Sequence, residues 1–334
     1  MNKVRFGIIG SGGIAQKRTI PGLLLAANAE CTAIMDLNEE LLKQVGDKFG
    51  ITRRYTSMDE LLAQSDIDAV YIATPVFTHK EQVFAAAKAG KHILLEKPMG
   101  LTAAEGEEMR RFCEECGVKL GVGFMMRFHG AHEEIRRLLA AGELGEVVTA
   151  YAKFNCLSPV SDKKWRQTKA FSGGGTMMDM GIHCIDLLQF MTTMNATAVT
   201  AFCGNQIFRY PDTEDGATAI LRMPNGAFFT VEANFNVPDT IGGCRFEIYG
   251  TKGCITAEGT LGQTETGTAR ITTENGTRAI VYDTKNMYTK EIEALANAIL
   301  NDTAVPVTAE QAIFNQRIVE AVYESQETER HIKL

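Results

Sequence analysis

The sequence lacks the features that mark membrane-spanning, nucleic-acid-binding and disulfide-rich proteins. It has no apolar run near the roughly 18–20 residues of a membrane span. Acidic residues outnumber basic ones by 41 to 34, and the resulting net charge of −7 argues against nucleic acid or an anionic membrane as the main partner. Eight cysteines scattered over 334 residues are too few for a disulfide scaffold. Because the opening MNKVRFGIIG has the pattern of a buried strand rather than a signal peptide, we expect a reduced, cytoplasmic protein.

The composition that is present is typical of a globular chain. Hydrophobic residues make up 45% and charged residues 22%, which excludes wholesale disorder. A length of 334 residues predicts two domains. In residues 1–125, continuous apolar runs such as VRFGIIG, DAVYIATP and HILLEKP alternate with helical patterns. This alternation predicts an α/β domain with a doubly wound parallel sheet, the Rossmann arrangement.

Residues 126–334 follow a different pattern. After a helical segment, a long strand and a second helix, alternating runs separated by turns such as PNG and ENG extend from about Ala198 to Asp283. These runs predict a large, mainly antiparallel open sheet, followed by two closing helices. We therefore expect a C-terminal α/β domain over residues 126–334.

A glycine-rich turn joins the first strand to the first helix. It has the G-x-G-x-x-A pattern of a dinucleotide-binding loop, with the residues Gly10, Ser11, Gly12, Gly13, Ile14 and Ala15. Gly10 permits the tight turn, Gly12 lets the backbone approach a pyrophosphate, and Ala15 lets the helix pack closely on the strand. The motif is weak alone, but its place at the first strand–helix turn predicts a nucleotide site.

Asp36 ends the second strand, a little over 20 residues beyond the glycines. A carboxylate there accepts hydrogen bonds from the adenosine ribose and repels a 2′-phosphate, so NAD is favoured over NADP without excluding it. Arg53 and Arg54 could reach a 2′-phosphate, or they could be surface charges before the third strand.

Polar residues also end two other strands of the predicted parallel sheet, at the edge where such sheets bind ligands. Thr74 and Pro75 follow one strand, and His79 comes just after them, either to cap the next helix or to contact the cofactor. Glu96 and Lys97 end another strand. Placing a lysine this close to a core is costly, which favours a functional role for Lys97. Desolvation beside a cationic nicotinamide would lower its pKa and make it a useful hydrogen-bond donor to a reacting oxygen.

The second domain carries a candidate acid–base pair. Asp179 and His183 are i and i+4 on a predicted helix that follows the glycine run Gly173–Gly175, which we interpret as flexible. Residues at this spacing share a helix face, and a carboxylate beside an imidazole fixes its tautomer and raises its basicity. Asp186, three residues further on, could support His183 or cap a neighbouring element.

These motifs together resemble the glucose–fructose oxidoreductase/inositol dehydrogenase (Gfo/Idh/MocA) family over nearly the whole chain. The matching segments are GSGGIA, Asp36, ATP with His79, EKP and the run DMGIHCID, of which EKP and DMGIHCID are the specific ones. The resemblance implies NAD(P)-dependent oxidation or reduction of a sugar, cyclitol or related polyol. It also implies a homodimer or homotetramer assembled through the C-terminal sheet, and a Lys97–Pro98 peptide bond that is often cis.

By matching position, the resemblance implies that Lys97, Asp179 and His183 are the catalytic residues. His183 would remove the proton from a substrate hydroxyl, Lys97 would hydrogen-bond the same oxygen, and Asp179 would orient His183. This hypothesis needs Lys97 and His183 to converge over the nicotinamide.

Weaker candidates surround these residues. Arg166 is assigned to cofactor binding, and the candidate substrate contacts are Arg127, Asn155, Trp165 and Tyr288. Arg127 could instead form a domain-bridging ion pair, and Trp165 could only anchor its loop. His129 and His132 are interpreted as surface residues of a helix start. Cys113 and Cys116 resemble half of a metal motif, but no second half follows, so no metal site is expected.

Two other functions remain open at this point. Some relatives use bound NAD for transient oxidation that permits elimination of a glycosyl group, and such an enzyme would cleave an aryl glycoside without net NADH. A protein with this fold could also be a non-catalytic sensor of sugars or nucleotides, although a sensor has no need of Lys97, Asp179 and His183 together.

Overall fold

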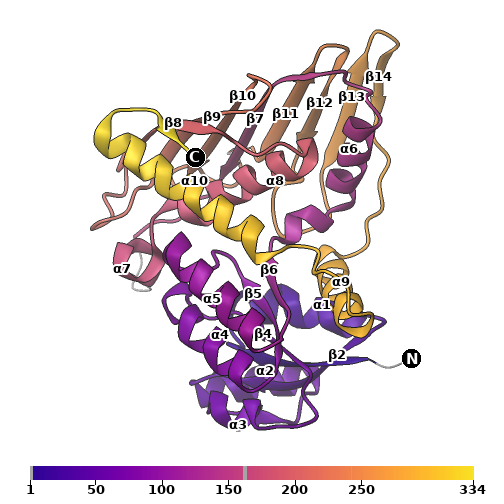
Figure 1. Cartoon of the computed structure of the whole chain (residues 1–334), viewed down its shortest axis with the longest axis vertical. Coiled ribbons are helices and arrows are strands. Elements are labelled where there is room, and N and C mark those ends of the chain that lie inside the picture. The colour runs from indigo at the N-terminus through magenta and orange to yellow at the C-terminus, as the bar shows by residue number, and fades with distance from the viewer. Residues whose placement is uncertain (1–2, 161–163, 242) are drawn as a thin grey trace. The chain divides into compact units, whose positions relative to one another are not determined.

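The computed structural model describes residues 3–160, 164–241 and 243–334. The chain forms two compact units (Figure 1). The first unit comprises Met1–Met125 and Asn286–Ile313, and the second comprises Met126–Lys285 and Phe314–Leu334. The segment Asn286–Ile313, which the sequence pattern placed in the C-terminal domain, thus packs with the N-terminal residues.

The first unit is built on a parallel sheet, as the sequence predicts. Among its described residues the sheet has six strands in the order β3-β2-β1-β4-β5-β6. The strands are β1 (Val4–Ile9), β2 (Ala29–Met35), β3 (Arg54–Tyr55), β4 (Ala69–Ile72), β5 (His92–Glu96) and β6 (Leu120–Gly123). The strand order reverses direction between β1 and β4, and ligands of open α/β sheets bind outside the carboxyl ends of the strands at such a point.

Helices cover this sheet, and one of them comes from far along the chain. The helices are α1 (Ile20–Leu25), α2 (Glu39–Phe49), α3 (Met58–Leu62), α4 (His79–Lys88), α5 (Ala103–Glu115) and α9 (Met287–Leu300). In α9, Ile292 and Leu295 are buried in the same core cluster as Phe6 and Ile8 of β1. This shared apolar core explains why α9 belongs to the first unit.

The second unit contains a mixed, mostly antiparallel sheet. Its described residues form nine strands in the order β14-β13-β12-β11-β7-β10-β9-β8-β15, with β7 and β10 parallel. The strands are β7 (Val147–Asn155), β8 (Ala198–Gly204), β9 (Gly216–Arg222), β10 (Phe228–Asn234), β11 (Arg245–Gly250), β12 (Gly253–Glu258), β13 (Thr268–Thr273), β14 (Gly276–Ala279) and β15 (Ile332–Lys333). The expected large open sheet is confirmed.

Helices lie on one face of this sheet, and among the described residues none covers the other face (Figure 1). They are α6 (Gly130–Ala140), α8 (Ile182–Thr192) and most of α10 (Ala309–Thr328), whereas the short α7 (Lys169–Ser172) lies beside the sheet rather than on its face. Burial alternates along the strands accordingly: in β9, Ala219 and Leu221 are buried while Ile220 and Arg222 are exposed. A period of two is what a sheet with one covered face requires.

Candidate active site

The glycine loop of the first unit has the geometry that a dinucleotide site requires. Gly10 has a φ of +89°, and a Cβ at this position would lie 2.9 Å from Thr74 Cγ2. Gly13, with a φ of +47°, is exposed and would meet nothing within 4 Å, so the loop is open on that side. Ala15 is fully buried, as close packing of the helix requires. The residues present therefore fit a bound dinucleotide.

The helix that follows this loop opens with a π-helical turn, η1 (Ala15–Thr19). The Ile20 amide donates to the Ala15 carbonyl, five residues back, instead of four. Pro21, the second residue of α1, has no amide hydrogen to donate, so it fits only at the start of the α-helical segment that follows the π turn. Single π turns are often found at functional sites.

Asp36 is fixed beside the glycine loop. Its carboxylate accepts a hydrogen bond from the Ser11 amide at 2.9 Å and another from the Asn38 amide at 3.0 Å. Arg53 is paired with Asp66 at 2.5 Å and Arg54 with Asp47 at 2.8 Å. Both arginines are therefore engaged within the unit, as their interpretation as surface charges expects.

His79 joins two ligand-edge turns of the first unit. The side chain is buried, with Nε2 3.0 Å from the Thr74 carbonyl and Nδ1 3.1 Å from the Pro98 carbonyl. Burial lowers the pKa of His79. Its ring holds the turn after β4 to the Lys97–Pro98 turn, where the peptide bond is cis. The ring therefore caps no helix, and its contact with the cofactor stays a prediction.

Glu96 is half-buried, and the sequence did not reveal that a second carboxyl group, of Glu291, is close enough to feel its charge. The Tyr71 hydroxyl donates a hydrogen bond to the Glu96 carboxylate. Glu291 of α9 is buried, and burial together with the charge of Glu96 raises the pKa of Glu291 well above its usual value. The Tyr71 hydroxyl thus holds the strand end that precedes the half-buried Lys97.

In the second unit, Asp179 and His183 lie on one continuous helix. Asp179 is in a π-helical turn, η5 (Met177–Gly181), and His183 is in the first turn of α8, which follows directly. His183 is buried, with its ring edge-on to Phe154 of β7 at 6.0 Å between centroids, while Asp179 is half-buried. The helix therefore presents both groups from its first two turns.

Asp186 is engaged elsewhere and neither supports His183 nor caps a helix. It accepts hydrogen bonds from Arg127 Nε at 2.8 Å and from Asn315 Nδ2 at 2.6 Å. Asp186 and Arg127 are both buried, and both belong to the second unit. Arg127 therefore takes part in an ion pair, as one of its two interpretations expects, but the pair lies within one unit rather than between domains.

The glycine run before this helix is tightly packed rather than flexible, which corrects its interpretation. A Cβ at Gly174 would lie 2.1 Å from the Tyr323 hydroxyl, and one at Gly175 would lie 2.0 Å from the Glu214 carbonyl oxygen. Glycine is needed at both positions because these oxygen atoms occupy the space that a Cβ would take. Glu214, absent from the sequence-based candidates, contacts this run directly.

The weaker substrate candidates have diverse surroundings. Asn155 lies on β7 next to Phe154, and its side chain donates to Glu232 at 3.4 Å. Because neighbouring strand residues point to opposite faces, Asn155 faces away from the side on which Phe154 contacts His183. Tyr288 is buried in the first unit against Gly22. Trp165 lies under the exposed Arg166 guanidinium at 4.1 Å.

The prediction that His129 and His132 lie at the surface is wrong, because both are fully buried. Their rings stack at 4.7 Å between centroids, His129 Nδ1 accepts from the Ala131 amide, and burial lowers the pKa of His132 to about 3.

All eight cysteines are free thiols; Cys113 is buried and Cys116 exposed. Within the described residues, no cluster suited to a metal ion and no helix able to cross a membrane is found.

Comparison with known proteins places these two units in one family. A model described as an oxidoreductase family with an NAD-binding Rossmann fold matches residues 4–124, and a Gfo/Idh/MocA C-terminal domain matches residues 132–256. The chain is 32% identical to the D-xylose 1-dehydrogenase (NADP(+)) 2 of Haloferax volcanii, over 98% of this chain and 99% of that one. The chain belongs to the Gfo/Idh/MocA family. Its assignment as an NAD(P)-dependent oxidoreductase is thereby confirmed.

Further members of the Gfo/Idh/MocA family are similar along nearly their full length. The 1,5-anhydro-D-fructose reductase of Ensifer adhaerens is 29% identical over 93% of this chain and 92% of its own. The crystal structure of aldose-aldose oxidoreductase from Caulobacter crescentus, complexed with glycerol, has a TM-score of 0.94 at 27% identity and covers all of both chains. The two-sheet architecture is thus the one known for this family.

Proposed function

We propose that the protein transfers a hydride between NAD and a carbinol or carbonyl carbon of a sugar, cyclitol or related polyol. The observation that carries this proposal is the pair Asp179 and His183 on the first turns of one helix, in a chain whose other unit has the glycine loop of an NAD site. The names of its relatives, a xylose dehydrogenase and an anhydrofructose reductase, support a sugar as substrate.

The chain's own residues handle the proton and the geometry. When bound, the nicotinamide accepts or supplies the hydride. His183 takes the proton of the substrate hydroxyl in oxidation and returns it in reduction, while Asp179 keeps the imidazole oriented. Lys97 donates a hydrogen bond to the same oxygen, which stabilises the negative charge that develops there.

Asp36 supports NAD over NADP as the preferred cofactor. Two backbone amides fix its carboxylate at the carboxyl end of β2, where the adenosine ribose binds in this type of fold. The arginines nearest in sequence, Arg53 and Arg54, are paired with Asp66 and Asp47. The 2′-phosphate of NADP would therefore be repelled by the Asp36 carboxylate, and neither arginine is available to neutralise the phosphate.

Absorbance at the NADH band, followed with a panel of aldoses, cyclitols and keto-sugars and with each cofactor, tests this proposal. We expect turnover with at least one sugar, and a loss of about a hundredfold or more in kcat for Lys97→Met and for His183→Asn. NAD binding, measured by calorimetry, should survive both changes. Cleavage of an aryl glycoside without net NADH, or full turnover in both variants, would contradict the proposal.

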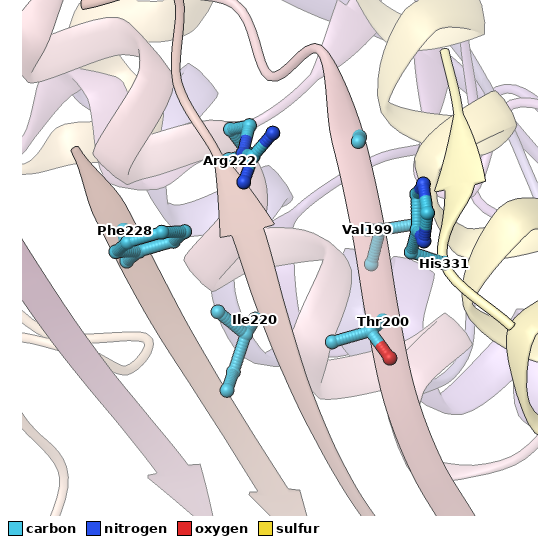
Figure 2. Close-up of a pocket in the computed structure, with 7 residues that line it drawn as sticks. Val199, Thr200, Ile220, Arg222, Phe228 and His331 are labelled. Carbon is cyan, nitrogen blue, oxygen red and sulfur yellow. The ribbon is translucent and has the colours of Figure 1, made fainter. Parts of the chain in front are cut away.

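We further propose that the open face of the second unit's sheet joins copies of this chain. Three large apolar side chains on neighbouring strands are exposed on this face: Phe202, Ile220 and Phe228. Figure 2 shows Ile220, Phe228 and Thr200 along these strands, around a hollow of about 250 Å³ that Arg222 and His331 also line. Contiguous exposed apolar residues of this kind favour association, and a homodimer buries the same patch twice.

Light scattering after gel filtration tests this association. We expect a dimer or tetramer for the native chain and a lower mass for the double variant Phe202→Asp, Ile220→Arg. A control pair on the exposed surface of α2, Glu39→Gln with Glu40→Gln, should leave the mass unchanged. A native monomer at micromolar concentration would overturn this part of the proposal.

A further inference from the structure

The helix that carries Asp179 and His183 begins at a buried carboxylate. Glu214, two residues before β9, accepts hydrogen bonds from the amides of Gly175 and Met177, each at 2.9 Å. Its carbonyl oxygen accepts from the Thr176 amide at 3.2 Å. The first amides of a helix have no partner within it, and the positive end of the helix dipole favours a negative charge there. Glu214, from a distant part of the sequence, supplies both the missing hydrogen-bond acceptors and the negative charge.

Tyr323 of α10 holds this carboxylate from the other side. Its hydroxyl donates to Glu214 Oε1 at 2.9 Å. The contact needs Gly174, because a Cβ there would lie 2.1 Å from the same hydroxyl. Burial raises the pKa of Glu214 and raises that of Tyr323 well above its usual value. The three residues thus form a close-packed support beneath the start of the helix.

The support is coupled to the acid–base pair by a short, continuous stretch of helix. The Asp179 amide bonds the Gly175 carbonyl at 3.1 Å, so Asp179 lies one turn from the residues that Glu214 holds. The Ile182 amide bonds the Met177 carbonyl, and His183 is the next residue. A shift of the helix start would therefore displace Asp179 and His183 together.

We propose that Glu214 is a positioning residue for the hydride-transfer reaction, fixing the helix start that presents Asp179 and His183, with Tyr323 holding Glu214 in place. The inference rests on the proposed function of Asp179 and His183. Glu214 acts through the helix, because its carboxyl group is buried and bonded within the second unit. Displacing a catalytic group by about 1 Å costs as much as a hundredfold in rate.

The test is Glu214→Gln, which keeps the size of the side chain but replaces one acceptor oxygen by an NH₂ group. The side chain of glutamine can then accept only one of the two hydrogen bonds from the Gly175 and Met177 amides. We expect kcat to fall about ten- to a hundredfold, with the KM for NAD unchanged because the glycine loop belongs to the first unit. The limb of the pH–rate profile that reports His183 should shift as well.

Tyr323→Phe and Ser325→Ala form a matched pair on α10. Tyr323→Phe removes the hydroxyl that holds Glu214, and we expect the same changes as for Glu214→Gln but smaller. Ser325 is also buried; it accepts from the Ala201 amide at 3.1 Å and donates to the Arg330 carbonyl at 2.6 Å. Ser325→Ala should cost comparable stability while leaving kcat within about twofold of the native value.

Imidazole resonances provide a readout that does not depend on turnover. In NMR spectra of the protein with labelled histidine, the His183 signals, assigned with His183→Asn, should shift in Glu214→Gln and remain in place in Ser325→Ala. If the native protein turns over no sugar, the proposed function fails and this readout still decides the inference. An unchanged His183 titration with unchanged kcat would overturn it. If Glu214→Gln does not fold, Tyr323→Phe decides by the same criteria.

Discussion

Each unit of the molecule starts a functional helix with a glycine-rich turn and a π-helical segment, but the two helix starts differ in what meets them. In the first unit the turn at Gly10–Gly13 leaves its exposed side open. In the second unit the amides of Gly175 and Met177 are already bonded to Glu214. The first helix start is therefore suited to binding an external anion, whereas the second is filled by the protein's own carboxylate. Similar glycine runs thus leave space for a ligand in one unit and pack against the protein itself in the other.

The largest expected difference between the two helix starts is in the stability lost when one glycine of each run is replaced by alanine. Gly175→Ala places a Cβ 2.0 Å from the Glu214 carbonyl oxygen, so we expect a loss of about 3 kcal/mol or more in the free energy of unfolding. Gly13→Ala meets no atom within 4 Å and carries only the strain of its positive φ, about 1–2 kcal/mol. Denaturant unfolding measures both, and calorimetry should show weakened NAD binding for Gly13→Ala. Equal stability losses would contradict the comparison.

Acid should destabilise the second unit through His132. Its pKa is about 3 in the fold and 6.5 when unperturbed. Between these values the unfolded chain binds a proton that the folded chain does not, so stability is lost as the pH falls. The loss is at most about 1.4 kcal/mol per pH unit. His132→Asn should flatten this dependence in thermal unfolding followed between these two pH values; a slope that remains unchanged would exclude His132 as its source.

Glu291 should give the first unit the opposite dependence. Burial raises its pKa well above the usual 4.5, so above that pH the unfolded chain releases a proton that the folded chain keeps. Stability therefore falls as the pH rises through this range. Glu291→Gln has no proton to release, and we expect a higher unfolding temperature than the native protein at neutral pH. A lower one would show that the carboxyl group has a bonding role that glutamine cannot fill.

The smallest expected effect concerns which cofactor the open loop accepts. Asp36→Ala removes the charge that opposes a 2′-phosphate, and we expect the ratio of kcat/KM for NAD to that for NADP to fall about tenfold. Glu30→Gln is the matched control, because it removes a carboxylate from the other end of the same strand, where the side chain is exposed. A ratio that changes equally in both variants would mean that net charge, rather than position, sets the preference.

The parts of the site that could be predicted from the sequence are those that depend on residues close together in the chain. The glycine turn follows from residues adjacent in the chain, and the shared helix of Asp179 and His183 follows from their spacing. The parallel sheet follows from continuous apolar strands alternating with helices. The specific motifs EKP and DMGIHCID carried the family resemblance over both units.

The remaining features depend on contacts between distant segments, which one sequence does not reveal. The amphipathic pattern of α9 predicts a helix, but not that Ile292 packs with β1 of the first unit. His129 and His132 follow a helix-start pattern, yet Tyr282 and Phe246 enclose them. Glu214 reads as one acidic residue in a polar stretch, and only the fold brings it to the start of the helix.

The distribution of cysteine and tryptophan provides an intrinsic spectroscopic ruler. Cys116 is the exposed thiol among the eight and belongs to the first unit, whereas burial raises the pKa of Cys31 and Cys113 to about 12 and slows their alkylation. Trp165, the single tryptophan, belongs to the second unit. Energy transfer between Trp165 and a maleimide dye attached at Cys116 would measure whether the separation of the two units changes when NAD is added, without any substitution in the native sequence.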